Sequence, residues 1–283
     1  MVIGQVLPAG MANARPPRGN GATTDRKSNM TVEANRPKVS FIIPVLHLKR
    51  PKNLSRFFVP RYTVDEVLRD IKQNVSLSHE IILVCNGDDA ELREFVKTDR
   101  RIDKFCINNV NVGVARGWNM GAELAEGEAL CFVNDDVEIG KGAIERLHEV
   151  LIGDPSIGQV GPRGAKWRHG AHQRFVGELE PEEADAISGF LFLIPEQLYR
   201  EIGGFDVRYT PAGFEEIDMS FEIRRRGRKC LVVPNLAIHH HHHHGVSAYR
   251  TEIRYLGKSI DTETLHARNK AYFLRKWRDL DAP

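Results

Sequence analysis

Two adjacent carboxylates follow a wholly apolar stretch in the middle of the chain. Five apolar residues occupy positions 129–133, and Asn134, Asp135 and Asp136 come directly after them. Such a run predicts a strand buried on both faces of a mostly parallel sheet, and these sheets bind ligands beyond the carboxyl ends of their strands. Neighbouring like charges repel each other, so the pair needs water or a cation; Mg²⁺ or Mn²⁺ carrying a phosphorylated ligand would suit it. The plainer alternative is an Asp-Asp turn that closes the strand.

A second acidic group lies at the start of a later helix. Glu215, Glu216 and Asp218 occupy the first turn of a helix that we expect to run to Arg226 and to stop at Gly227. Acidic side chains in a first turn are also favoured by the helix dipole alone, so the cluster has a purely structural alternative.

Six consecutive histidines, His239 to His244, lie inside the chain, whereas purification tags are placed at termini. In an extended stretch alternate imidazoles face opposite sides, so only one or two of them can share a metal ion. Neutral imidazole is a common metal ligand, and we expect at least one of these histidines to be functional.

Asn111, Gly113 and Asn119 belong to a loop that enters a helix, shortly before the 129–133 strand. Glycine permits close backbone approach, and the amides at a helix start attract anions. Asn-Gly loops are frequent, but this position favours the binding of a diphosphate.

The elements that position these groups alternate between strand and helix. We expect strands at 39–44, 80–85 and 104–107 and helices at 63–75 and 90–96. Pro44 is expected to end the first strand, and Thr63 with Glu66 forms a capping box. This alternation implies right-handed crossovers and a parallel sheet, which makes the chain an α/β protein.

The second half is less regular. We expect a helix at 142–152, a strand at 158–161, a long polar loop at 162–185, a buried strand at 186–194, a helix beginning at Pro195 and a strand at 229–233. Loops as long as the one expected at 162–185 are usually functional or mobile in a compact domain.

The composition limits the classes of protein. A chain of 283 residues can bury one large core, and its net charge of +2 does not favour nucleic acid as a partner. No apolar segment approaches the roughly 20 residues that cross a bilayer, so we expect a soluble chain and leave peripheral membrane contact open. Residues 1–38 are expected to form a disordered tail, with a transit peptide as the alternative. Four cysteines without CxxC spacing indicate reduced core residues of a cytoplasmic protein: Cys85, Cys106, Cys131 and Cys230.

From about Val39 to Gly245 the chain resembles the family 2 glycosyltransferases, which are nucleotide-sugar-dependent enzymes of the GT-A fold. The order and spacing of the matching pieces are more specific than any single piece. These pieces are Val39 to Pro44, Asn111-Val112-Gly113 with Asn119-Met120-Gly121, Phe132 to Val137, Ser188-Gly189-Phe190, Ile202 to Asp206 and Phe214 to Asp218. Arg268-Asn269-Lys270 with Lys276-Trp277 also looks like a segment of many such enzymes.

The resemblance implies a single Rossmann-like GT-A domain over 39–283, with a mostly parallel central sheet flanked by helices. Its expected parts are a nucleotide-binding half at 39–137, an acceptor-binding half at 138–247 and a C-terminal helical segment at 248–283. The implied reaction is inverting transfer of a sugar from a nucleoside-diphosphate sugar to a hydroxyl group of a glycan, a lipid-linked saccharide or a small molecule, with Mg²⁺ or Mn²⁺.

The resemblance also implies roles for individual residues. By this resemblance Asp136 is a metal ligand, together with one histidine of the run. Counting forward from Pro234 favours His240 as that histidine, and counting back from Ser247 favours His242. Glu216 becomes the catalytic base, with Glu215 beside it. Cys85 stands where many members have an aspartate that contacts the nucleotide base, so the identity of that base stays open. The donor is expected to contact Pro44, Val45, Leu46, Asn86, Asn111, Gly113, Asn119, Asn134, Asp135, Ser188 and Gly189.

Other functions stay open. A nucleotidyltransferase would carry a glycine-rich basic loop after the first strand, where residues 45–48 contain no glycine. A non-catalytic GT-A scaffold and a retaining transferase are further alternatives. The sequence does not name the sugar, the acceptor or the oligomeric state, and a homodimer stays open. The central prediction is that acidic side chains near positions 136 and 216 converge on one cleft.

Overall fold

The computed structural model describes residues 36–49, 62–241 and 250–278, and the folded unit is Pro37–Pro283. Strand β4 (Ala129–Val133) is buried along its whole length, as predicted, and lies fourth in an eight-stranded sheet of this described part. The order of that sheet is β3 (Lys104–Asn108), β2 (His79–Asn86), β1 (Val39–Val45), β4, β11 (Leu191–Pro195), β6 (Ile157–Gly161), β12 (Lys229–Val232) and β9 (Glu182–Ala184). The predicted tail, apart from 36–38, lies outside the described residues.

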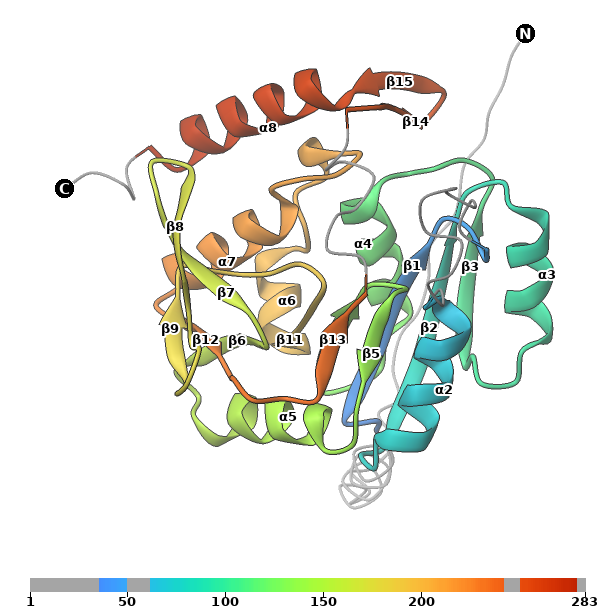
Figure 1. Cartoon of the computed structure of the whole chain (residues 1–283), viewed down its shortest axis with the longest axis horizontal. Helices are drawn as coiled ribbons and strands as arrows, with labels where there is room; N and C mark the ends of the chain where they lie inside the picture. The colour runs from blue at the N-terminus through green and yellow to red at the C-terminus, as the bar shows by residue number, and fades with distance from the viewer. Residues whose placement is uncertain (1–35, 50–61, 242–249, 279–283) are drawn as a thin grey trace, which may run out of the picture. The chain divides into compact units, whose positions relative to one another are not determined.

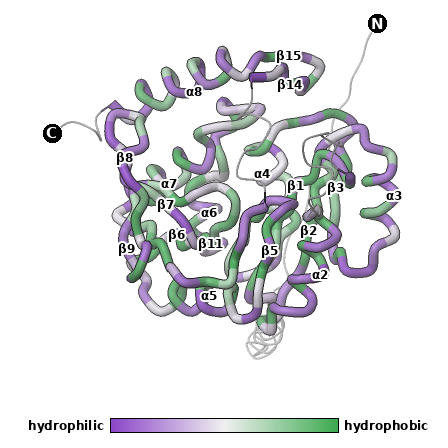
Figure 2. Tube along the Cα trace, in the orientation of Figure 1, coloured by the Kyte–Doolittle hydropathy of each residue, from purple (hydrophilic) through white to green (hydrophobic). Residues whose placement is uncertain are grey.

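Helices cover both faces of the sheet (Figure 1). One hydrophobic cluster joins the sheet to α2 (Val64–Asn74), α3 (Ala90–Thr98) and α5 (Ala143–Gly153). A second cluster, on the other face, joins it to α4 (Val114–Leu124), α6 (Glu196–Ile202) and α7 (Glu215–Arg225). Because side chains alternate along a strand, Phe41 of β1 belongs to the first cluster and Ile42 to the second. Figure 2 accordingly colours the central strands mostly hydrophobic.

The four strands β3, β2, β1 and β4 are parallel, as the strand-helix alternation predicted. The predicted end of the first strand at Pro44 is wrong, because β1 continues to Val45 and Pro44 pairs with Val84. The ladder between β1 and β4 extends only from Val39 to Ile42, so proline is tolerated where β1 has a partner on one side. The predicted capping box is present, since the Glu66 carboxylate accepts a hydrogen bond of 2.9 Å from the Thr63 amide.

The second half of the sheet is mixed. β11 is antiparallel to both β4 and β6, whereas β12 runs parallel to β6 and antiparallel to β9. The predicted loop at 162–185 is wrong, because it forms β7 (Gly164–Arg168), β8 (Ala171–Val176) and β9. β7 and β8 form an antiparallel hairpin whose exposed face carries charged and polar residues, so the sequence shows no clear alternation of apolar residues there.

The predicted continuous strand at 186–194 is also wrong. It divides into β10 (Ala186–Ile187), which pairs with β7, and β11, which pairs with β4. Ser188, Gly189 and Phe190 lie between the two pieces, where the chain passes from one sheet to the other.

Two further pairs of strands complete the unit. β5 (Val137–Ile139) pairs with β13 (Ile238–His240), and β14 (Glu252–Tyr255) pairs with β15 (Lys258–Asp261). The chain then enters α8 (Thr262–Lys276), which Figure 1 shows next to α7. No helix among the described residues is long and apolar enough to cross a membrane.

Candidate active site

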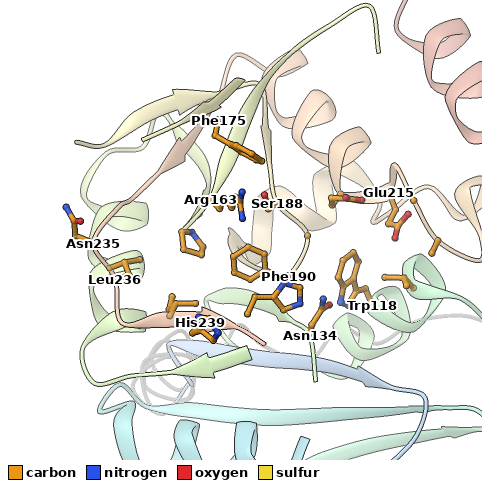
Figure 3. Close-up of a pocket in the computed structure, with 18 residues that line it drawn as sticks. Trp118, Asn134, Arg163, Phe175, Ser188, Phe190, Glu215, Asn235, Leu236 and His239 are labelled. Carbon is orange, nitrogen blue, oxygen red and sulfur yellow. The ribbon is translucent and has the colours of Figure 1, made fainter. Parts of the chain in front are cut away.

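A cavity of about 770 Å³ opens where the two halves of the sheet meet. His240 of β13 and Glu216 of α7 line it. Asn134 reaches it from the end of β4 and Glu215 from the start of α7 (Figure 3). Ser188, Gly189 and Phe190, from the break in the predicted 186–194 strand, line the same space. Side chains from distant parts of the sequence therefore share one cavity of a size typical of ligand sites.

The two members of the acidic pair differ in exposure, because Glu215 is buried and Glu216 is partly exposed. Phe214 precedes the pair with a positive φ of 79°, and α7 begins at Glu215. Glu215 is 4% exposed, and its Oε2 has no hydrogen-bond partner among the described residues. Burial, followed by the charge of Glu216, raises the pKa of Glu215 well above its ordinary value, and burial also raises the pKa of Glu216. A carboxyl group with a raised pKa is suited to accepting or donating a proton near neutral pH.

Gly189 explains why this pair can approach the 188–190 segment. A Cβ atom at position 189 would lie 3.0 Å from Cγ of Glu216 and 3.2 Å from its Cδ. A side chain at position 189 would therefore push the Glu216 side chain back by a few tenths of an ångström, and glycine allows the closer contact.

His239 and His240 form the other wall, and Asp136, which does not line the cavity, contacts His240. Asp136 is 2% exposed, and its Oδ1 lies 3.2 Å from Nε2 of His240. The His240 ring stacks on Phe190, with the ring centroids 4.8 Å apart. The segment that ends β4 and the acidic pair therefore border one cavity through Asn134, Glu215 and Glu216, whereas the Asp136 carboxylate is buried beside His240 and does not line it. The predicted convergence of the carboxylates near 136 and 216 stays a prediction. Asp135 is only partly buried beside them.

The histidine run is extended where the structure describes it, and its rings alternate as predicted. His240 faces Asp136, whereas His241 contacts Glu138 at 2.9 Å and stacks on Tyr62. His242, the other predicted metal ligand, lies outside the described residues.

An oxygen donor and a nitrogen donor 3.2 Å apart fit neighbouring positions around a divalent cation, because ligands about 2.1 Å from Mg²⁺ at a right angle lie about 3 Å from each other. No group of three potential ligands occurs within 36–49, 62–241 and 250–278. Two protein ligands agree with a Mg²⁺-type site that is completed by substrate phosphates and water.

The predicted donor residues at the end of β1 differ in exposure. Val45 is completely buried, backbone included, so the structure does not expose it to a ligand. Pro44 lies close to Gly117 of α4, and Leu46 lies close to Gly87, which follows β2. Cys85 is completely buried in the cluster under α2 and α3, so its side chain cannot contact a nucleotide base.

The loop before α4 already uses its own amides. The amides of Val112, Gly113 and Val114 donate to Asn86 Oδ1, Asn111 Oδ1 and the Pro211 carbonyl, each at 2.8 Å. The structure therefore contradicts the expectation that these amides are open to a diphosphate. The sequence could not show this in full, because two of the three acceptors, Asn86 and Pro211, come from β2 and from the loop before α7.

Asn119 is likewise committed to a structural contact. Its Nδ2 donates to the Phe205 carbonyl at 2.9 Å, and its Oδ1 accepts from the Tyr199 hydroxyl and the Phe205 amide. Together with Asn86 it holds α4 in place rather than presenting a free amide to the cavity.

Sequence reasoning missed Arg163, Phe175 and Trp118, which all line the cavity. The Arg163 guanidinium lies 4.0 Å from the centre of the Phe175 ring, and both residues also line a neighbouring cavity of about 320 Å³. They fall on the hairpin region that was predicted to be a loop, and only its aromatic content was a signal. Trp118 follows the Asn111–Gly113 loop by one helical turn and packs on Phe132.

Comparisons with known proteins agree with this architecture. The family model described as glycosyl transferase family 2 matches residues 61–212. A probable N-acetylgalactosaminyltransferase 6 from Caenorhabditis elegans is 26% identical over an alignment of 242 residues that covers 73% of this chain and 38% of that protein. The chain therefore spans less than half the length of this relative.

Two solved structures share the fold. GalNAc-T7, in a structure with UDP, GalNAc and Mn²⁺, has a TM-score of 0.59 and 18% identity over 73% of this chain and 44% of its own. The mannosyltransferase PcManGT from Pyrobaculum calidifontis, in complex with GDP-Man and Mn²⁺, has a TM-score of 0.54 and 16% identity over 76% and 60%. The predicted GT-A fold is confirmed.

Proposed function

The chain belongs to glycosyl transferase family 2, and from that premise we propose that it is a metal-dependent glycosyltransferase. It transfers a sugar from a nucleoside-diphosphate sugar to a hydroxyl group of a saccharide or another small acceptor, with inversion at the anomeric carbon. The observation that carries this proposal is the single cavity lined both by Glu215 and Glu216 and by Asn134 and His240.

Glu216 is the proposed base. The acceptor hydroxyl attacks the anomeric carbon in line, its proton passes to the Glu216 carboxylate, and the nucleoside diphosphate leaves with the bonding electrons. A positioned base contributes roughly 10²–10⁴-fold to the rate. Because burial raises the pKa of Glu216, the rate should rise with pH through a midpoint above the ordinary value of 4.5.

Asp136 and His240 are the proposed holders of Mg²⁺ or Mn²⁺. When bound, the cation neutralises negative charge on the departing diphosphate. The two solved structures contain Mn²⁺ with UDP or with GDP-Man, which supports Mn²⁺ with UDP and GDP as the first ligands to test. Asn134, Asp135, Ser188 and Gly189 stay predicted donor contacts.

In this proposal the nucleotide part of the donor lies near the ends of β1 and β2, and its sugar points into the cavity. The acceptor enters the cavity from the side of Arg163 and Phe175. A cytoplasmic location and peripheral membrane contact stay predictions.

The proposal is tested by measuring nucleoside diphosphate released from UDP- and GDP-sugars with Mn²⁺, with and without saccharide acceptors. We expect Glu216→Gln to lower this turnover at least 100-fold while Mn²⁺-dependent binding of UDP or GDP survives. Glu94→Gln is the matched control, because Glu94 is an exposed glutamate of α3, on the opposite face of the sheet. Unchanged turnover in Glu216→Gln removes this residue from the base role, and a retained anomeric configuration in the product contradicts inversion.

A further inference from the structure

The C-terminal helix α8 lies beyond the part of the chain that the family model matches, yet it contacts the segment that leads into the acidic pair. Asn269 is the centre of this contact. It is 1% exposed, and its Nδ2 lies within hydrogen-bond distance of three carbonyl oxygens: Tyr209 at 2.9 Å, Ala212 at 3.0 Å and Gly213 at 2.8 Å. One amide group therefore holds both ends of the 209–213 segment.

Arg268 completes this arrangement from the neighbouring position. Its guanidinium donates to the Thr210 carbonyl at 2.5 Å and, through Nε, to Oδ1 of Asn269 at 3.0 Å. Four of the five carbonyl groups in 209–213 are thus bonded by two adjacent side chains of α8. The remaining one, of Pro211, accepts from the Val114 amide at the start of α4 at 2.8 Å.

The 209–213 segment is part of the cavity wall. Ala212 and Gly213 line the cavity, and Glu215 follows two residues after Gly213. On the other side of the acidic pair, α8 also bonds α7 itself, because Trp277 Nε1 and Lys276 Nζ each lie 2.7 Å from a carboxylate oxygen of Asp218. Helix α8 therefore restrains the chain both before and after Glu215 and Glu216.

The docking of α8 does not depend on Asn269. Phe273 and Trp277 are buried in an apolar cluster with Tyr209, Ile217 and Phe221. Loss of the Asn269 amide would leave this cluster intact and release three carbonyl groups of the cavity wall.

We propose that Asn269 is a positioning residue: it fixes the 209–213 wall and thereby sets the orientation of the Glu215–Glu216 pair in the cavity. This inference depends on the proposed function, because the orientation matters only if the pair reacts with a substrate. Displacement of a reacting group by about 1 Å can cost about 100-fold in rate.

The test compares Asn269→Ala with two other substitutions in α8. Phe273→Leu disturbs the apolar anchor without touching the 209–213 carbonyls, and Lys270→Ala changes an exposed residue of the next position. We expect Asn269→Ala to lower kcat for donor turnover about 10- to 100-fold, with the KM for the sugar nucleotide changing less than 3-fold. Phe273→Leu should lower the Tm by at least as much as Asn269→Ala does, but it should keep most of kcat. Lys270→Ala should change neither the Tm nor kcat.

Hydrogen–deuterium exchange supplies a readout that does not require activity. Asn269→Ala should accelerate exchange in peptides covering 207–218 while peptides from 265–277 stay protected. If turnover of the wild type is absent, the proposed function fails, and exchange still decides whether Asn269 holds the wall. Equal loss of kcat in Phe273→Leu at matched Tm, unchanged exchange over 207–218, or a kcat of Asn269→Ala within 3-fold of the wild type would each overturn the positioning role.

Discussion

Nε2 of His240 lies 3.2 Å from Oδ1 of Asp136, although the two residues are more than 100 positions apart. The pairing of β13 with β5 creates this contact, because it places His240 opposite Val137, the residue after Asp136. His240 therefore faces the end of the central strand and His241 faces Glu138, while His239 also lines the cavity.

This geometry predicts different effects for neighbouring histidines. His240→Ala should weaken Mn²⁺-dependent binding of UDP or GDP about 10-fold or more, since it removes one of the two proposed protein ligands. His241→Ala should leave binding within about 2-fold, because His241 contacts Glu138 and Tyr62 instead. Calorimetric titration of the nucleotide with and without Mn²⁺ measures both, and equal effects in the two variants would reject His240 as the specific ligand.

Burial of the Glu215 carboxyl group is expected to lower the stability of the folded protein by an amount that depends on pH. A carboxyl group with a higher pKa in the folded state binds more protons when folded, so stability falls as pH rises from its ordinary value of 4.5 toward the raised pKa. Glu215→Gln removes this titration. Its Tm should therefore exceed that of the wild type, by a margin that grows between pH 5 and pH 8, while turnover falls.

Thermal unfolding of Glu215→Gln and Glu94→Gln across this pH range provides the measurement and its control. A Tm difference that shrinks with rising pH would show that Glu215 is not a strained buried acid.

The sequence predicted best where local pattern and burial coincide. Residues 129–133 form a strand with the predicted bounds, because a fully apolar run has no other stable place than the middle of a sheet. The acidic pair begins α7 as expected, since carboxylates in the first turn interact favourably with the helix dipole.

Long-range contacts were beyond the sequence. Asn86 and Asn119 looked like ligand residues, but their amides bond backbone groups of 112–113 and 205. An asparagine that binds a ligand and one that anchors a loop have the same local signature. Only the fold, which brings α4 next to β2 and to the segment after α6, distinguishes them.

Substitution of Gly113 tests how closely the start of α4 must approach the 209–213 wall. A Cβ atom there would lie 2.7 Å from Thr210 Cγ2 and 2.8 Å from the Pro211 carbonyl oxygen, and φ is 87°. Gly142 has a similar φ of 80° but nothing within 4 Å of an added Cβ, so Gly142→Ala measures the backbone strain alone. We expect Gly113→Ala to be the more destabilising by about 1–3 kcal/mol, the usual cost of overpacking. Equal denaturation midpoints would mean that the wall yields freely.

The position of Arg163 and Phe175 predicts that a substitution there weakens acceptor binding without changing the reaction of the donor with water. Phe175 is 43% exposed beside both cavities, so Phe175→Ala should raise the acceptor KM about 10-fold, corresponding to about 1.4 kcal/mol of lost contact. Hydrolysis of the donor by water should be unchanged. Phe105→Ala is the control, because Phe105 is 42% exposed on β3, at the opposite edge of the sheet. A parallel loss of donor hydrolysis would place this pair at the donor instead.

Among these substitutions, we expect the replacement of Lys276 to lower the free energy of unfolding most. Its Nζ lies 2.7 Å from Asp218, 3.2 Å from Glu222 and 3.3 Å from Asp206. Burial alone would lower the pKa of Lys276, but the three carboxylates outweigh burial and raise it, so this ammonium stays charged.

Lys276→Met should destabilise the protein by about 3–5 kcal/mol, because it leaves the buried carboxylate of Asp218 without its cation. The pairing can be isolated with a double-mutant cycle, since Asp218→Asn removes the charge that Lys276 compensates. We expect the double variant to be more stable than the sum of the two single losses predicts. Lys270→Met, on the exposed side of α8, should change the unfolding free energy by less than about 0.5 kcal/mol. Additive losses in chemical denaturation would show that Lys276 stabilises α8 through its packing and not through Asp218.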